Sequence, residues 1–588
     1  MSIFNVLKNI KYMLSIVAKN TPLYFFSVIV FNIVDNLITT MISVYLVKQI
    51  FNSIESQSFS NVMLFVGIMA IFQISNQILQ SVFKYKIVPI QKLRLHSKLH
   101  AKLFVKACEI DLECYDSPDF YNDFILSLNE IDERANSVIN DFGKLLARIL
   151  SIIAISYLLV SIEPLLLLIT IFIVILSSVL QQKINKISFS RNISINPQIR
   201  KNDYIVRVFY MKDYSKELRL NNLSKILFKK FDESTNEMNN AVLNHNRKVV
   251  LINIISIMFT SSLFDMGVML LFAFRMMVTK VLTLGDYASG INAIWQLRNH
   301  LSCLINCYSS FQNNSQYIER LKVFINYKPK IVSLSKARIS KDCSAEITFK
   351  NVCFGYKNEN TILKNINFTI NTGEKIAIVG LNGAGKTTLI KLLLRLYEPL
   401  SGSVEFNNIN INKYEIQKYR SGFGIVFQDY NLYYATLAEN ISMDDIFDEN
   451  VIEYSLQKSG FYKKNVDINT IITREFNNEG VVLSGGESQK VAISRAFAHS
   501  FHTLILDEPS SALDPIAEYK FNKMLLESSK DKTVILISHR LSTTRIADRI
   551  LFIDNGEIIE AGTHNELMNK KGKYAEMFNI QSKKYVNY

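Results

Sequence analysis

The stretch GLNGAGKT at residues 380–387 decides the fold of the second half of this chain. It fits the pattern G-x-x-x-x-G-K-[ST], in which backbone N–H groups of a glycine-rich turn surround phosphate groups. The apolar run KIAIVG (375–380) predicts a strand before the turn, and TTLIKLLLRLY predicts a helix after it, with its N-terminus toward the phosphates. In this pattern Lys386 contacts the outer phosphates and Thr387 binds Mg²⁺. We therefore predict a P-loop for ATP and Mg²⁺ formed by Gly380, Asn382, Gly383, Ala384, Gly385, Lys386, Thr387 and Thr388.

An α/β domain is predicted around this unit. Alternating apolar residues in EITFKNVCFGY and TILKNINFTI indicate strands, and so do apolar runs at 503–507, 533–538 and 549–553. The middle, near 411–465, is predicted to be predominantly helical. The segment 324–345 loses apolar periodicity and gains charge, which indicates a linker. The pattern as a whole predicts an α/β P-loop ATPase domain at residues 346–588.

The first half of the chain is predicted to be an α-helical transmembrane domain, residues 21–323. Each of six apolar stretches approaches the roughly 20 residues that a spanning helix needs. They lie at about 22–50, 60–83, 145–161, 164–182, 249–278 and 284–310. We expect six spanning helices, with two long loops at about 84–140 and 183–248.

The net charge of +14 raises the alternative of a nucleic-acid-binding protein. The distribution of the charge favours a membrane protein instead. Residues 183–248 contain fourteen Lys and Arg against six Asp and Glu, whereas the connection 51–60 contains no Lys or Arg. This asymmetry follows the positive-inside rule. It predicts a multi-pass protein of the cell membrane whose termini, long loops and ATPase domain lie in the cytoplasm, with no nucleic-acid partner.

Residues 1–20 carry apolar side chains at helical spacing, with lysines between them. This pattern predicts an interfacial helix at the membrane surface. A helix that packs on the transmembrane domain is the alternative, and both alternatives keep the N-terminus in the cytoplasm.

The six cysteines form no C-x-x-C pair and show no metal-binding spacing with histidine. Cys303 and Cys307 lie one helical turn apart, and we interpret them as packing residues rather than as a ligand pair. The cysteines therefore imply no metal beyond the Mg²⁺ of the P-loop.

Further motifs follow the P-loop in the order and spacing of one protein family. They are VFQDYNL around Gln428, LSGGE at 483–487, LILDEP at 504–509, SALD at 511–514 and ISHR at 537–540. Through them the chain resembles an ABC half-transporter of the exporter type, in which the membrane domain precedes the nucleotide-binding domain. Bacterial exporters of peptides, drugs and lipids belong to this family.

The resemblance implies a role for each motif residue. Tyr356 would stack on adenine, with strand packing as its alternative. Asp507 and Gln428 would bind Mg²⁺ directly or through water, and Gln428 would also link the ATP site to the membrane domain. Glu508 would be the base that polarises the attacking water, and His539 would contact the γ-phosphate.

The signature LSGGE adds an expected partner. Ser484, Gly485 and Gly486 would open a helix whose N–H groups face an anion, and Glu487 stands where the family usually has Gln. In the resembled family the signature and the D-loop, here with Asp514, contact nucleotide in the site shared with the opposite subunit. A dimer is therefore implied, with a second copy or with a related half-transporter.

Two cytoplasmic segments, 115–123 and 206–220, resemble the coupling helices of exporters, with ordinary loop helices as the alternative. Polar residues also recur at helical spacing within two predicted spans, Asn292, Gln296 and Asn299 in one and Asn32 and Asp35 in the other. They predict either the lining of an aqueous cavity or hydrogen bonds between helices.

These observations together predict ATP-driven export of a peptide or an amphipathic small molecule, with membrane lipid and the cargo as partners. A lipid or multidrug exporter and the competent subunit of a heterodimer are the alternatives. A regulatory ATPase that transports nothing is disfavoured by the intact Glu508.

Overall fold

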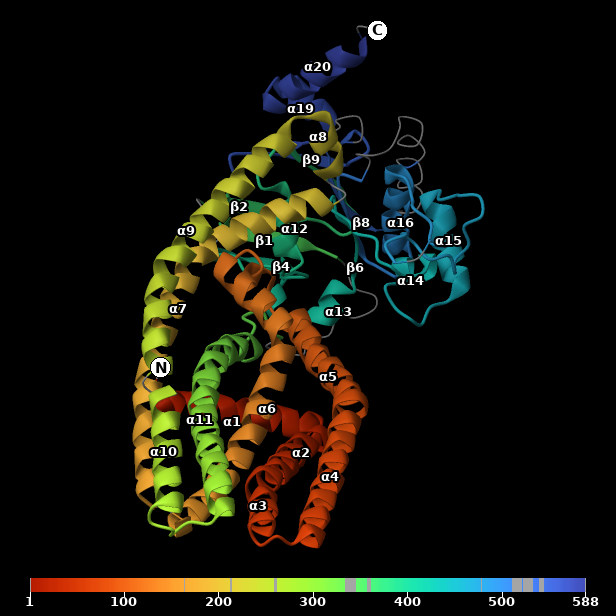
Figure 1. Ribbon diagram of the computed structural model, residues 1–588. Coiled ribbons are helices and arrows are strands. Elements are labelled where there is room, and N and C mark those ends of the chain that lie inside the picture. The colour runs from red at the N-terminus through yellow and green to blue at the C-terminus, as the bar shows by residue number, and fades with distance from the viewer. Residues whose placement is uncertain are drawn as a thin grey trace. The chain divides into compact units, whose positions relative to one another are not determined.

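A computed structural model describes residues 2–162, 164–211, 214–258, 262–333, 345–356, 361–476, 478–509, 521, 532–538 and 544–586. The chain forms two compact units. One is helical and comprises Met1–Ala107 and Asp123–Asn326. The other contains the β-sheets and comprises Tyr327–Tyr588 together with the excursion Cys108–Asn122 (Figure 1).

The helical unit consists of long helices joined by short turns (Figure 1). Its helices are α1 (Ile3–Asn20), α2 (Pro22–Thr40), α3 (Val47–Glu55), α4 (Phe59–Val82), α5 (Val88–Glu109), α6 (Pro118–Ile162), α7 (Pro164–Tyr210), α8 (Ser215–Leu220), α9 (Leu223–Ile257), α10 (Leu263–Met277) and α11 (Leu284–Ile325). Proline opens α2, α6 and α7, where its missing N–H has no intrahelical partner to lose. Thr283 and Asp286 form a capping box that begins α11. π-helical turns at Met41–Leu46 and Phe83–Ile87 join α2 to α3 and α4 to α5.

Four helical stretches of the described chain are long and apolar enough to cross a membrane. They are Pro22–Glu55, Phe59–Glu109, Ser127–Ile162 and Leu166–Asn192. At most 22% of the residues in their most apolar windows are buried inside the protein, as expected for side chains that face lipid. The predicted fifth span includes the undescribed residues 259–261, and the sixth lies on the polar-striped helix α11. The total of six therefore stays a prediction.

The core of the helical unit joins α6, α7, α10 and α11 around buried side chains such as Leu159, Phe272 and Leu297. α10 and α11 approach closely at Gly290, where a Cβ atom would lie 2.6 Å from the Phe272 ring. A side chain at Gly290 would therefore push these helices apart.

Helix α1 buries one face against α11 and leaves another exposed. Val6, Ile10 and Met13 are buried, while Ile3 and Phe4 are exposed. Asn9 Nδ2 donates to Ser315 Oγ at 2.9 Å. One face of α1 therefore packs on the helical unit, as the alternative prediction had it. The other face is exposed and apolar, so the interfacial helix stays a prediction.

The second unit contains two β-sheets. An antiparallel sheet has the order β2-β1-β4-β5, and a mainly parallel sheet has the order β10-β9-β3-β8-β7-β6, with β10 as the antiparallel edge. The strands are β1 (Ile347–Phe354), β2 (Leu363–Ile370), β3 (Lys375–Gly380), β4 (Ser401–Phe406), β5 (Ile409–Asn410), β6 (Phe423–Val426), β7 (Thr503–Asp507), β8 (Thr533–Ile537), β9 (Arg549–Asp554) and β10 (Glu557–Gly562). The helices are α12 (Lys386–Leu393), α13 (Ile416–Arg420), α14 (Leu437–Ser442), α15 (Glu449–Ser459), α16 (Gly485–Phe497), α19 (His564–Lys570) and α20 (Lys573–Val586).

The strands expected from the sequence are confirmed, but β4, β5, β6 and β10 were not expected. β6 lies inside the segment near 411–465 that was predicted to be predominantly helical, so that prediction was wrong at this point. The run FGIV is too short to show a period. It becomes a strand because Phe423 to Val426 pair in parallel with Thr503 to Leu506 of β7.

Candidate active site

The strand register brings three motifs to one edge of the parallel sheet. Ile537 at the end of β8 pairs with Asp507 at the end of β7 and with Ile378 near the end of β3. The loops after these strands therefore start side by side. This edge, at the carboxyl ends of parallel strands, is where open α/β sheets bind ligands.

The P-loop follows β3 and depends on glycine at its ends. Gly380 has φ of 155°, and a Cβ atom there would lie 2.1 Å from the carbonyl oxygen of Ile553. Gly385 has φ of 100°, and a Cβ atom there would lie 2.5 Å from Leu363 Cδ2. Either substitution would force the backbone out of place, so the turn over the N-terminus of α12 requires both glycines.

Lys386 begins α12, directly after the glycine-rich turn. Its Nζ donates to the carbonyl oxygens of Gly380 at 3.0 Å and Leu381 at 2.9 Å, and the residue is 6% exposed. Burial lowers the pKa of Lys386, and the carboxylates of Glu508 and Asp507 oppose that shift. Within the described part of the chain, the hydrogen-bond partners of this ammonium group are the two loop carbonyl oxygens.

Thr387 and Asp507 form an oxygen-donor pair that fits Mg²⁺. Thr387 Oγ1 donates to Asp507 Oδ2 at 2.8 Å, and Asp507 is 1% exposed. Burial raises the pKa of Asp507, although the Thr387 hydrogen bond opposes this. Asp507 Oδ1 is buried and has no hydrogen-bond partner among the described residues. A buried carboxylate with one unpaired oxygen beside a hydroxyl is a donor set suited to a hard divalent cation.

Glu508 follows Asp507 with a left-handed backbone, φ of 51°. Its N–H donates to the carbonyl oxygen of Ile537, which ties the residue to the end of β8 at 3.0 Å. Gln428 Nε2 donates to Glu508 Oε2 at 2.9 Å. Positive φ in a residue with a Cβ is strained, and such strain concentrates at functional sites. The backbone bond to Ile537 and the bond from Gln428 together hold Glu508 at the carboxyl end of the strands.

A cleft of about 490 Å³ brings half of the predicted site residues together. It is lined by Tyr356, Ile362, Asn382, Gly383, Gly385, Lys386, Thr387, Thr388, Gln428 and Glu508. Tyr356 OH lies 3.4 Å from Thr388 Oγ1, so the aromatic ring stands at the side of the P-loop helix. Ala384 instead packs into the hydrophobic core. His539 and Asp514 lie outside the described residues.

The signature residues do not line this cleft. Ser484 is the N-cap of α16, and Glu487 completes a capping box with it. Lys463 Nζ forms an ion pair with Glu487 Oε2 at 2.8 Å, which lowers the pKa of that carboxyl. Glu487 therefore has a structural partner here, and the exposed Ser484 and Gly485 present the N-terminus of α16 outward.

Tyr430 is a contact that the sequence did not indicate. Its OH donates to the carbonyl oxygen of Gly485 at 3.1 Å. Tyr430 lies two residues after Gln428, so this bond joins the Gln428 loop to the signature helix. The one available signal was its place inside the VFQDYNL motif.

The excursion Cys108–Asn122 packs within the ATPase unit and includes most of the segment 115–123. Tyr397 OH donates to Asp116 Oδ2 at 2.6 Å. Asp111 accepts from Tyr327 OH and from the backbone N–H of Lys330, each at 2.7 Å. These bonds hold the excursion on the face of the unit that carries Tyr397.

Tyr397 packs behind the cleft wall, against Tyr356, and sequence reasoning missed it. Its ring meets the Tyr356 ring edge to face, with centroids 5.3 Å apart. Burial and the hydrogen bond to Asp116 raise the pKa of Tyr397 well above its usual range. Tyr397 thus links the aromatic wall of the cleft to the Cys108–Asn122 excursion.

Replacing Tyr397 by Phe should loosen that excursion. A hydrogen bond to a charged group contributes about 1.5–3 kcal/mol, so the local opening equilibrium should rise about 10- to 100-fold. We expect hydrogen–deuterium exchange at residues 112–117 to accelerate accordingly, with ATP binding retained. Tyr462→Phe, at an exposed tyrosine of the same unit, is the matched control. Unchanged exchange at 112–117 in Tyr397→Phe would contradict the link.

The polar stripes of the helical unit make several hydrogen bonds between helices. Asp35 Oδ1 accepts from Asn76 Nδ2 at 3.0 Å and from Gln80 Nε2 at 2.7 Å. Gln296 Nε2 donates to Ser43 Oγ at 3.0 Å. Of the two interpretations of the polar stripes, hydrogen bonding between helical segments applies to Asp35 and Gln296.

Other members of the α11 stripe remain exposed. Asn299 and Asn306 are exposed, whereas Ile294 and Leu297 on the opposite face are buried. Between these faces Arg298 forms an ion pair with Asp265 of α10 at 2.7 Å. One face of α11 therefore presents amide groups outside the core of the helical unit.

Comparisons with known proteins point to one family. The family described as ABC transporter matches residues 363–511. The subtilin transport ATP-binding protein SpaT of Bacillus subtilis is 31% identical over 84% of this chain and 81% of its own length. An ATP-dependent lipid A-core flippase of Wigglesworthia glossinidia brevipalpis is 32% identical over 70% of both chains.

Fold and site define a membrane protein with a P-loop ATPase domain. The structure of a bacterial Atm1-family ABC exporter with ATP bound superposes with a TM-score of 0.77 and 21% identity, covering 96% of this chain and 98% of that one. That likeness shows the fold, and the SpaT alignment shows the family. The chain belongs to the ABC transporters and is an exporter in which ATP hydrolysis drives transport.

Proposed function

We propose that this exporter moves a peptide or an amphipathic small molecule across the cell membrane. The observation that carries the proposal is the exposed amide face of α11, with Asn299 and Asn306. Polar side chains within a membrane segment rarely face lipid, because their transfer into hydrocarbon is costly. A water-containing cavity that accepts a cargo with both polar and apolar groups gives this face a favourable environment.

We also propose that the working unit is a dimer. Its support is that the α16 N-terminus is exposed and lies outside the cleft formed by the same chain. A second copy, or a related half-transporter, would bring its Ser484, Gly485 and Gly486 to the phosphates in this cleft. The N–H groups and dipole of α16 would then face an anion, as helix N-termini commonly do. Asp514, in the D-loop, would complete the shared site.

The proposed hydrolysis follows from the side chains of the cleft. Lys386 exchanges its two carbonyl partners for phosphate oxygens of ATP. Glu508, oriented by Gln428, takes the proton of the attacking water. Mg²⁺, held by Thr387 and Asp507 with Gln428 nearby, would neutralise charge on the phosphates. His539 would contact the γ-phosphate.

The orientation in the membrane is part of the proposal. The excess of Lys and Arg at 183–248 supports a cytoplasmic position for both long loops, the ATPase domain and both termini. Asn32, Asp35, Asn292 and Gln296 would then contribute to the hydrogen bonds and walls of the helical unit that face the cavity.

Lipid is the second candidate cargo. Its support is specific, because the lipid A-core flippase from Wigglesworthia covers 70% of this chain and a second, from Idiomarina loihiensis, covers 59% at 35% identity. The relative described as a subtilin transporter covers 84%. We therefore rank subtilin-like cargo ahead of lipid.

The cargo can be identified by stimulated ATPase activity of the chain purified in lipid nanodiscs. We expect the rate to rise severalfold with one class among subtilin, other peptides, amphipathic drugs and lipid A. A double change of Asn299 and Asn306 to Leu should abolish the stimulation while the basal rate stays. If the double variant responds to cargo like the wild type, the cavity proposal is wrong. A rise with lipid A alone would favour the second candidate.

A further inference from the structure

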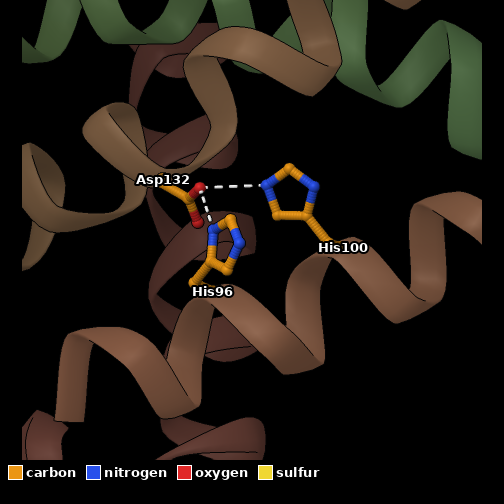
Figure 2. Close-up of side chains that lie close together, drawn as sticks. All are labelled: His96, His100 and Asp132. Atoms are coloured by element: carbon orange, nitrogen blue, oxygen red, sulfur yellow. Dashed lines mark hydrogen bonds and ion pairs between the residues drawn. The ribbon is translucent and has the colours of Figure 1, made fainter. Parts of the chain in front are cut away.

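Two histidines and one aspartate of the helical unit converge on a single point (Figure 2). His96 and His100 lie on α5, and Asp132 lies on α6. His96 Nδ1 lies 2.6 Å from Asp132 Oδ2, and His100 Nε2 lies 2.9 Å from the same oxygen. The three potential ligand atoms are all within 4.8 Å of one another. Neither the ATP site nor the amide face of α11 uses these residues.

We propose that His96, His100 and Asp132 bind a divalent transition-metal ion, with Zn²⁺ as the best match. Histidines at i and i+4 project from one face of a helix, as in known zinc-binding helices. Imidazole nitrogens with one carboxylate oxygen are ligands that Zn²⁺ takes at about 2.0–2.2 Å, with water in the fourth position. Ligand atoms around such an ion stand slightly over 3 Å apart, so each His–Asp separation needs to open by less than about 1 Å.

A buried, unpaired oxygen supports a ligand at this point. Asp132 Oδ1 is buried and has no hydrogen-bond partner among the described residues, although both histidines crowd the other oxygen. Leaving a buried acceptor unpaired destabilises the folded state. A cation beside the carboxylate would compensate the unpaired Oδ1. The two His–Asp hydrogen bonds do not, because both are made to Oδ2.

Charge and access at the cluster also suit an incoming cation. The His96 side chain is 53% exposed, which leaves an entry path from solvent. Two cationic side chains close in sequence to the cluster have other partners: Lys98 Nζ donates to the Asn20 carbonyl oxygen, and Arg134 pairs with Glu130 at 2.6 Å. Within the described part of the chain, the side-chain partners of the Asp132 carboxylate are the two imidazoles.

The other nitrogen of each imidazole ring sets the expected affinity. His96 Nε2 and His100 Nδ1 have no hydrogen-bond partner within the described part of the chain. Zinc ligands in strong sites usually donate their other N–H to a carboxylate or carbonyl, and loss of such a partner weakens binding about 10- to 100-fold. We therefore expect reversible binding, weaker than at a closed structural zinc site.

The site would join α5 and α6, the two helices that precede and follow the Cys108–Asn122 excursion. α5 ends at Glu109 and α6 begins at Pro118, and Cys108–Asn122 belongs to the ATPase unit. A metal between His100 and Asp132 would fix α5 to α6 at the base of this hairpin. Binding to the folded state should also raise the melting temperature of the protein.

Zinc titration of the metal-stripped, tag-free full-length protein tests the proposal. We expect one Zn²⁺ per chain in wild type, and at least a tenfold loss of that affinity in His100→Asn and Asp132→Asn. His245→Asn, at a helical histidine outside the cluster, is the matched control and should bind like wild type. Because thiols also bind zinc, the titration is repeated with the cysteines replaced by Ser in the wild type and in each variant, and the same result is expected in both backgrounds. Equal zinc binding in wild type and both cluster variants, or none in any, would overturn the site.

A second variant keeps the test valid if an Asn variant misfolds. His96→Cys preserves a metal ligand, so in the same cysteine-free background it should bind Co²⁺ with a thiolate charge-transfer absorption that the parent lacks. The absorption should disappear when Asp132→Asn is added. A His96→Cys protein without that absorption would contradict the proposed geometry.

Discussion

Replacing Glu508 by Gln is expected to lower the ATP hydrolysis rate about 10²- to 10⁴-fold, the usual contribution of a general base. Glu508 follows the buried Asp507, and Gln428 donates to its carboxylate at 2.9 Å. A glutamine at 508 can still accept that hydrogen bond through its amide oxygen, so the fold should not change. The amide cannot take a proton from water, so the chemical step alone should slow.

The measurement is phosphate release by the purified chain in lipid, together with ATP binding. ATP affinity should stay within a few-fold of wild type in Glu508→Gln. The control is Glu557→Gln, because Glu557 is an exposed glutamate of the edge strand β10 and lies outside the cleft. Hydrolysis in Glu508→Gln within tenfold of wild type would mean that another group acts as the base.

Replacing Lys386 by Ala should abolish ATP binding at ordinary concentrations. The ammonium group makes two hydrogen bonds to P-loop carbonyl oxygens and is free to transfer them to phosphates. Hydrogen bonds to charged groups contribute about 1.5–3 kcal/mol each, so losing two should weaken ATP binding about 10²- to 10⁴-fold. Lys386→Ala should therefore lose ATP binding, whereas Glu508→Gln should bind ATP and lose only hydrolysis.

Equilibrium binding of a fluorescent ATP analogue, beside a melting curve, separates the effect from misfolding. Lys364→Ala removes an exposed lysine from β2 of the same unit and should bind the analogue like wild type. Should Lys386→Ala melt like wild type and still bind ATP within a few-fold of it, Lys386 would not be the phosphate ligand of this cleft.

Much of the ATPase domain was predictable because its motifs are local. The P-loop needs glycines, Lys386 and Thr387 within one short stretch. The continuous apolar runs of β3, β7 and β8 indicate buried strands without any knowledge of their neighbours. β6 was missed, because four residues show no period and the strand exists through its pairing with β7.

The role of Tyr397 was not predictable for a related reason. Nothing in the sequence around Tyr397 indicates a hydrogen-bond partner, and Asp116 lies far away in the sequence. Their hydrogen bond exists because the Cys108–Asn122 excursion packs within the ATPase unit.

The polar stripes of the helical unit were also ambiguous in the sequence, because they implied either a cavity or hydrogen bonds between helices. In the structure Asp35 and Gln296 form hydrogen bonds between helical segments, whereas Asn299 is exposed.

The sequence by itself determined the chemistry of this protein: a P-loop, a carboxylate pair at 507 and 508, a signature helix and an apolar first half. These follow from residue types at short spacing, which set local backbone geometry and burial. Tertiary structure alone decided that Gln428 contacts Glu508 and that His96 and His100 meet Asp132. It also decided that Asp507 and Asp132 each keep a buried oxygen with no hydrogen-bond partner among the described residues. Such contacts join residues far apart in the chain, so they depend on how whole elements pack, which no short pattern encodes.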